Sequence, residues 1–136
     1  MGRSKGQYAC LMVPFPPTTN NLFANDRGSG RYRTAQYKLW RGDAQRALRQ
    51  QSPLPHFQVA VSLVLTLGRP DKRRRDISNY IKAPEDALVE AGILDDDSQV
   101  EDVRARWSED VTGCMIEIEE IGPLWDATIA AARAVA

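Results

Sequence analysis

The stretch from residue 69 to residue 100 brings basic and acidic side chains close together in the sequence. Three arginines, Arg73, Arg74 and Arg75, lead directly into Asp76, and three consecutive aspartates, 95–97, follow further along. Lysine and arginine bind the phosphates of a nucleic-acid backbone. Carboxylates hold the hard divalent cations that assist phosphodiester hydrolysis. The combination predicts the active site of a metal-dependent nuclease.

Asp76, Asn79 and Lys82 follow one another at intervals of three residues. They share one face if this segment is helical, and Asp86 extends that face. A carboxylate, an amide and an ammonium suit a phosphate and a metal ion better than a hydrophobic core. The alternative is a solvated helix start, in which Asp76 is a cap and Lys82 a surface charge. Spacing alone does not separate the two interpretations.

The three aspartates 95–97 repel one another unless a cation or solvent relieves them. An exposed acidic turn is the more common origin of such a run. In the functional interpretation, at least one of the three enters a metal site. The arginine run could also be a solvated loop. Because it ends against Asp76, where a scissile phosphate would lie, phosphate binding is the better interpretation.

The first half of the chain must supply elements that position these residues. An apolar run predicts a strand over residues 8–13, and the Pro- and Gly-containing stretch 14–33 predicts a mobile basic loop. Thr34 can cap a helix that runs to about residue 50, with Tyr37 and Trp40 on its core face. Alternating apolar residues predict a strand over residues 57–67.

The second half begins with a helix that Asp76 or Ser78 can cap and that closes at Gly92. Pro84 either kinks this helix or marks the first turn of a second segment. Strands are expected over residues 98–107 and 114–121, and a helix over 123–136. The order of elements predicts one α+β domain, with a small mixed sheet and helices on one side.

Length and composition add limits. A chain of 136 residues is the size of one domain, and its first seven residues are expected to be frayed. The formal net charge of +0 argues neither for nor against nucleic acid. Cys10 and Cys114 are expected to be buried thiols of a cytoplasmic protein. The single histidine, His56, has no spaced partner for zinc, and no apolar run is long enough to span a membrane.

Taken together, these residues resemble the RusA family of Holliday-junction resolvases, which is found in bacteria and often in prophages. The resemblance covers residues 8–121. Its landmarks are Pro16-Pro17 followed by Asn20-Asn21, the basic run into Arg75-Asp76, then Asn79 and Lys82, Asp86-Ala87-Leu88, and Asp96-Asp97 followed by Gln99-Val100. No single landmark is specific, but the ordered set is. Residues 123–136 are an addition to the common core.

The resemblance implies a homodimer that binds four-way DNA junctions by shape and resolves them with paired nicks, using Mg²⁺, with Mn²⁺ as an alternative ion. It implies that Asp76 and Asp97 bind the metal, with Asp96 as a further ligand, and that Lys82 is catalytic. The DNA-binding residues are expected to be Arg73, Arg74 and Arg75 together with the loop residues Asn20, Asn21, Arg31 and Arg33.

Ser78 departs from the family pattern, which commonly reads Asp-x-Asp-Asn where this chain has Asp76-Ile77-Ser78-Asn79. Serine is a neutral and weaker metal ligand than a carboxylate. The site therefore recruits Asp96, Asp95 or Asn79, binds metal more weakly, or has lost catalysis. The alternative functions are an inactive protein that binds branched DNA and, in a different class, an acidic-site protein without a nucleic-acid role.

Overall fold

The computed structural model describes residues 6–26 and 30–121. Its main sheet has the strand order β1-β6-β4-β5, and a separate two-stranded hairpin is made of β2 and β3. The strands are β1 (Tyr8–Val13), β2 (Phe23–Asp26), β3 (Gly30–Arg33), β4 (Val61–Leu67), β5 (Val100–Trp107) and β6 (Cys114–Glu120). The helices are η1 (Thr19–Asn21), α1 (Ala35–Gln50), η2 (Ile77–Tyr80), α2 (Lys82–Glu90) and η3 (Asp97–Gln99). The predicted α+β class is confirmed.

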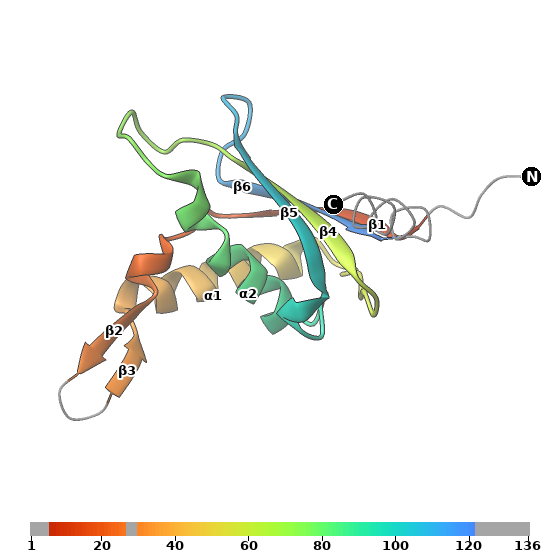
Figure 1. The fold of residues 1–136 in the computed structure, drawn as a ribbon, viewed down its shortest axis with the longest axis horizontal. Coiled ribbons are helices and arrows are strands. Elements are labelled where there is room, and N and C mark those ends of the chain that lie inside the picture. Colours follow the sequence, from red (N-terminus) through yellow and green to blue (C-terminus); the bar gives the residue numbers. More distant parts are fainter. Residues whose placement is uncertain (1–5, 27–29, 122–136) are drawn as a thin grey trace, which may run out of the picture.

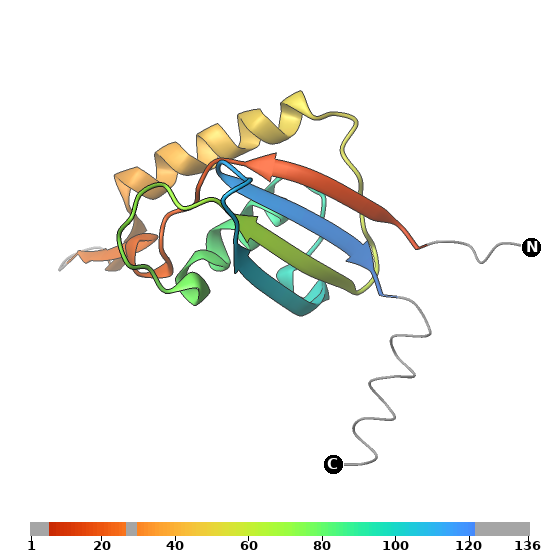
Figure 2. The same ribbon diagram turned by 90° about the horizontal axis from the view of Figure 1, so that it is seen from above.

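The sheet is mixed, as expected. β4 pairs in parallel with β5 and antiparallel with β6, which in turn pairs antiparallel with β1. Both long helices cover the same side of the sheet, as Figure 1 shows, and Figure 2 shows the four strands from above with α1 beside them. The helices meet a face of alternating buried residues, which on β4 are Val61, Leu63, Leu65 and Leu67.

The strand predicted over residues 57–67 is shorter than expected, since β4 begins only at Val61. Phe57 instead forms an isolated parallel bridge with Leu94, and Val59 is exposed. On β4, Val61, Leu63, Leu65 and Leu67 are fully buried under the helices, whereas Val64 on the opposite face is only partly buried.

The helix α1 follows the sequence closely. The side-chain oxygen of Thr34 accepts a hydrogen bond from the backbone N–H of Tyr37, which is the expected N-cap. Tyr37, Trp40, Ala44 and Leu48 are buried along one face. The indole Nε1 of Trp40 donates to the carbonyl of Pro14 at 3.1 Å, so the helix is tied to the segment that follows β1.

The prediction of a loop over residues 14–33 is wrong for the second half of this segment. Residues after the prolines form η1 and then the antiparallel hairpin β2–β3, which projects from the body of the molecule beyond α1 (Figure 1). Leu22 is fully buried, and its carbonyl accepts from the N–H of Thr34 at 3.1 Å. The segment therefore has a fixed path at its base. Gly28 and Arg27 lie outside the described residues.

The helix predicted from residue 76 to Gly92 is broken into η2 and α2. Pro84 lies in the first turn of α2, where a missing N–H costs nothing, so the second of the two predicted outcomes is confirmed. Gly92 closes α2 with a φ of 77°. The N–H groups of Ile93 and Gly92 donate to the carbonyls of Leu88 and Val89, each at 3.0 Å, which is a Schellman motif.

Two smaller expectations need correction. Cys114 is buried but Cys10 is exposed, and both are free thiols. Gln7 is not frayed, since it exchanges backbone and side-chain hydrogen bonds with Glu120. His56 pairs with a carboxylate, because its Nε2 lies 2.8 Å from Oδ1 of Asp95. The helix expected over residues 123–136 lies outside the described residues. No helix in the described ranges is long and apolar enough to cross a membrane.

Candidate active site

Lys82 lies between two acidic side chains. Its Nζ is 3.0 Å from Oδ1 of Asp86 and 3.3 Å from Oδ2 of Asp97. Lys82 opens α2 and Asp86 lies one helical turn later, whereas Asp97 opens η3 after the chain has reversed at Gly92. The fold therefore brings together two of the three predicted catalytic residues, and it adds Asp86 to them.

Gln99 fixes the turn that carries Asp97. Its Oε1 accepts from the backbone N–H groups of Asp95 and Asp96, at 2.7 and 3.0 Å. Its Nε2 donates to the carbonyls of Phe57 and Val59, at 2.8 and 3.0 Å. One amide thus joins the acidic turn to the segment before β4. The turn is exposed but not free, and Asp97 is held near Lys82 as a result.

Asp96 is the neighbour of Asp97 and was predicted as a further metal ligand. The hydroxyl of Ser98 donates to its Oδ2 at 2.5 Å. This bond is the leading reason why the pKa of Asp96 lies below its ordinary value, and further bonds from the following backbone add to it. Asp96 is therefore an ionised carboxylate beside the Lys82 site.

Tyr37 reaches the same site from α1. Its hydroxyl donates to Oδ2 of Asp86 at 3.3 Å, on the opposite carboxylate oxygen from the one that faces Lys82. Burial is the main cause of a raised pKa for Tyr37, and the negative charge of Asp86 adds to it. Sequence reasoning had treated Tyr37 as a packing residue. Its spacing on the core face of α1 gave no sign of a polar contact with α2.

A hollow of about 340 Å³ adjoins these residues and is called the acidic hollow below. Its lining consists of Phe23, Arg33, Tyr37, Arg41, Asp86, Val89, Glu90, Asp96 and Asp97. Arg41 is paired with Glu90 at 2.7 Å. Arg33, a predicted DNA-binding residue, thus lies at the same opening as Asp96 and Asp97, where its guanidinium can pair with a phosphate.

Asp76 is the predicted metal ligand that the structure does not bring into this group. It precedes η2 and is exposed, and its carbonyl accepts from the N–H of Asn79 at 3.1 Å. Ser78, two residues later, is also exposed. Across residues 6–26 and 30–121, no three Asp, Glu, His or Cys side chains are grouped to hold a metal ion. The predicted face of Asp76, Asn79 and Lys82 is interrupted, because Lys82 begins a separate helix.

The donor chemistry nevertheless fits Mg²⁺. This ion prefers carboxylate oxygens, keeps several waters, and is usually bound by one or two carboxylates together with substrate phosphates. Asp76, Asp96 and Asp97 are all exposed, so a phosphate can approach them. The position of Lys82 between Asp86 and Asp97 also shows that positive charge is stabilised at this point.

The three predicted phosphate-binding arginines differ in their surroundings. The side chain of Arg73 is 78% exposed and Arg74 is also exposed, but that of Arg75 is only 13% exposed. The guanidinium of Arg75 donates to Asp71 at 2.7 Å and to the hydroxyl of Tyr80 at 3.4 Å. Arg75 therefore has a structural role, and Arg73 and Arg74 are the members of the run that present their charge to solvent.

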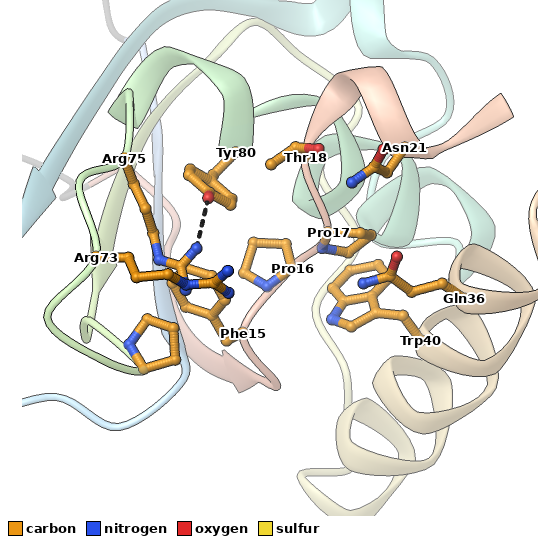
Figure 3. A pocket seen from close by; sticks show the side chains of 11 residues that line it. Phe15, Pro16, Pro17, Thr18, Asn21, Gln36, Trp40, Arg73, Arg75 and Tyr80 are labelled. Carbon is orange, nitrogen blue, oxygen red and sulfur yellow. Dashed lines mark hydrogen bonds between the residues drawn. The ribbon is translucent and has the colours of Figure 1, made fainter.

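A second pocket, of about 270 Å³, opens beside Pro16 and Pro17 and is called the proline pocket below (Figure 3). Its lining consists of Phe15, Pro16, Pro17, Thr18, Asn21, Gln36, Trp40, Pro70, Arg73, Arg75 and Tyr80. The hydroxyl of Thr19 donates to the carbonyl of Asn79 at 3.0 Å, which joins η1 to η2. Of the predicted loop residues, Asn21 lines this pocket, Asn20 is exposed beside it, and Arg31 lies 4.0 Å above the ring of Phe23.

The family described as Endodeoxyribonuclease RusA matches residues 14–119. This chain belongs to the RusA family. Similar relatives include the crossover junction endodeoxyribonucleases RusA of Enterobacteria phage HK97, of Escherichia coli strain K12 and of Enterobacteria phage 82. Each is 32% identical over 94 residues, which cover 69% of this chain and 78% of the relative. The resemblance inferred from the ordered landmarks is confirmed.

The RusA match spans every predicted site residue, from Asn20 to Asp97, and it ends before the C-terminal segment that was expected to be an addition. Membership of the RusA family does not assign roles to individual residues. Tyr37 enters the candidate site from the geometry alone. Asp86 was expected from the sequence to extend the face of Lys82, which lies four residues before it on one helix.

Proposed function

We propose that this chain is a Mg²⁺-dependent endodeoxyribonuclease that resolves four-way DNA junctions by paired nicks. The observation that carries the proposal is the placement of Lys82 between Asp86 and Asp97, at the opening where Asp96 and Arg33 also lie. The names of the RusA relatives, crossover junction endodeoxyribonucleases, support the same reaction and substrate. Hydrolysis of a phosphodiester needs acidic ligands, a cation near the reacting phosphate and positive charge along the backbone, and this chain offers all three.

Asp97 and Asp96 would hold the metal from the acidic turn, and Asp76 would approach it from the start of η2 once a substrate phosphate completes the coordination. Mn²⁺ is a possible substitute. When bound, the ion polarises the phosphodiester and makes a nearby water more acidic. Lys82 stabilises the negative charge that develops on the phosphate, because its ammonium is fixed before the substrate arrives. Asp86 keeps that ammonium in place, and the hydroxyl of Tyr37 holds the other oxygen of Asp86.

The exposed arginines Arg73 and Arg74 bind backbone phosphates next to Asp76, and Arg33 binds one at the acidic hollow. Asn20, Asn21 and Arg31 lie on the η1 and β2–β3 side, where they can contact a further arm of a branched DNA. Resolution of a junction requires two symmetric nicks, so the active form is a homodimer with two equivalent sites.

A protein that binds branched DNA without cutting it is the second candidate. Ser78 favours it, because a neutral hydroxyl stands where the RusA pattern has a carboxylate, and Asp76 lies apart from the acidic turn. The pairing of Lys82 with Asp86 and Asp97 acts against this candidate, because it keeps a fixed cation beside the acidic turn. The two functions differ in one measurable property, which is strand cleavage.

The deciding experiment is an assay on a synthetic four-way junction, with linear duplex as the comparison substrate, in Mg²⁺, in Mn²⁺ and in chelator. The proposed function predicts metal-dependent nicks in opposing strands of the junction. Asp76→Asn and Asp97→Asn should abolish the nicks while binding in chelator persists. Junction binding without nicks in either metal would establish the second candidate, and nicking by both variants at the wild-type rate would show that the site is misassigned.

A further inference from the structure

The proline pocket has a buried apolar floor and a polar rim. Pro16, Pro17, Trp40 and Tyr80 are buried, and the rings of Phe15 and Tyr80 lie 5.0 Å apart at 53°. Figure 3 shows the guanidinium groups of Arg73 and Arg75 on one side of the two prolines and Gln36 with Trp40 on the other. The exposed polar residues of the rim are Asn21, Gln36 and Arg73, and Pro70 is exposed as well.

The rim has the charge and the hydrogen-bonding groups that a nucleotide needs. Two arginines and two amides line the pocket, and none of the lining residues is a carboxylate. An amide side chain both donates and accepts, so Asn21 and Gln36 can each meet the mixed edge of a base. In the described part of the chain, Nε of Arg75 is buried and has no hydrogen-bond acceptor.

The size of the pocket limits what can enter it. A volume of about 270 Å³ lies just below the range that drug-sized ligands occupy. It cannot admit a base pair still stacked in a duplex, but it suits one planar heterocycle. A base enters such a pocket only after it leaves the stack, and this costs least where pairing or stacking is already weakened. The branch point of a junction is such a place, because the strands exchange there and the base stack of each arm ends.

We propose that the proline pocket binds one unstacked nucleobase of the DNA, with its phosphate against Arg73. This inference rests on the proposed function, since branched DNA is the source of the base. The pocket lies next to Asp76, one of the proposed metal ligands, because Arg75 in its wall precedes Asp76 directly and Thr19 is bonded to the carbonyl of Asn79. The captured base is therefore close to the scissile phosphate, and its identity influences where the strand is cut.

The test is a scan with abasic nucleotides. Four-way junctions that each lack one base, at successive positions around the branch point, are compared for affinity by fluorescence anisotropy in chelator, where cleavage does not interfere. Loss of a base stacked on a protein ring weakens binding by about 5- to 150-fold. That loss is expected at one nucleotide position of each cleaved strand and not at its neighbours.

Two protein variants complete the test. Gln36→Trp covers the opening from an exposed position on α1 and should abolish the position-specific loss, whereas Gln50→Trp, at an exposed glutamine near the other end of α1, should retain it. Circular dichroism melting of both variants establishes that they fold. A flat scan in the wild type, or the same loss in Gln36→Trp, overturns the base-binding pocket while junction binding stands. No binding to any junction overturns the proposed function and this inference together.

Discussion

The charge state of Lys82 depends on its two acidic neighbours, Asp86 and Asp97. Its bond with Asp86 is the leading cause of a pKa above the ordinary value of 10.5, and Asp97 raises the pKa further, while partial burial opposes both. Because the folded-state pKa is raised, the stability that this grouping adds is fully present below pH 10.5 and is lost as pH rises through the folded-state value. The lysine is 43% exposed, so solvent limits that contribution to about 0–1 kcal/mol.

Asp86→Asn should therefore lower the pKa of Lys82 and reduce kcat for junction cleavage while junction affinity stays close to wild type. The amide no longer carries the charge that holds the ammonium, so Lys82 is less well placed for the transition state. NMR titration of the Lys82 side chain measures the pKa. Asp43→Asn, which removes an exposed acid paired with Arg46 on α1, is the matched control. An unchanged lysine pKa in Asp86→Asn would refute the positioning role.

Ser78→Asp should lower the Mg²⁺ concentration needed for half-maximal cleavage, or create cleavage in an inactive protein. The change adds one hard oxygen ligand where the RusA pattern has a carboxylate. Ser78→Asn has nearly the same size without the charge and separates charge from shape. The effect must appear only with divalent metal. An identical metal dependence in both variants would mean that another acid already fills the role, and Asp96 is the first to test by Asn substitution.

At the scale of elements, the basic segment between β4 and η2 divides into two parts. Arg73→Ala and Arg74→Ala should weaken binding to every DNA shape and flatten the dependence of log affinity on log salt, by about 0.9 for each phosphate that the protein no longer binds. Arg75→Ala should in addition lower the thermal midpoint, because its guanidinium joins Asp71, Tyr80 and the ring of Phe15. An unchanged salt slope in the first two variants would place the DNA-binding surface elsewhere.

The elements differ in how well the sequence predicts them. Thr34 and the apolar spacing after it are sufficient for α1, because capping and burial act within one segment. The hairpin β2–β3 escaped prediction because the prolines and glycines of residues 14–33 are typical of a loop, and the burial of Leu22 depends on contacts from other parts of the chain. The sequence did not decide whether the helix breaks between η2 and α2, because Pro84 is compatible with either a kink or a first turn.

The candidate site shows the same division. The neighbour relation of Lys82 and Asp86 follows from helical spacing. The contact between Lys82 and Asp97 requires the chain to reverse at Gly92 and Gln99 to be anchored to the segment before β4. The spacing of residues in the sequence predicts neither the direction nor the length of that return. Tyr37 was assigned to the core for a sound reason, and only the packing of α1 against α2 reveals its hydroxyl contact.

At the scale of the whole molecule, paired nicking requires two copies of the chain. One chain has a mass of 15.2 kDa, and light scattering at micromolar concentration should give twice that mass. A mixture of wild-type and Asp97→Asn subunits should contain mixed dimers that nick only one strand of a junction. A monomeric mass both with and without DNA would contradict the homodimer, and so would full resolution by the mixed species alone.

The ion pairs of Lys82 have a consequence for how the protein behaves before it meets metal or DNA. Carboxylates gathered at one place normally repel one another and strain the fold until an outside cation arrives. Here Lys82 is the counter-ion, so removal of divalent metal by a chelator should leave the stability of the DNA-free protein nearly unchanged. Its thermal midpoint is expected to differ between chelator and Mg²⁺ by no more than about 2–4 °C, the shift that roughly 1 kcal/mol produces. Lys82→Met should behave in the opposite way, melting early in chelator and recovering with Mg²⁺, whereas a wild-type protein that needs Mg²⁺ to stay folded would show that the lysine does not balance the site.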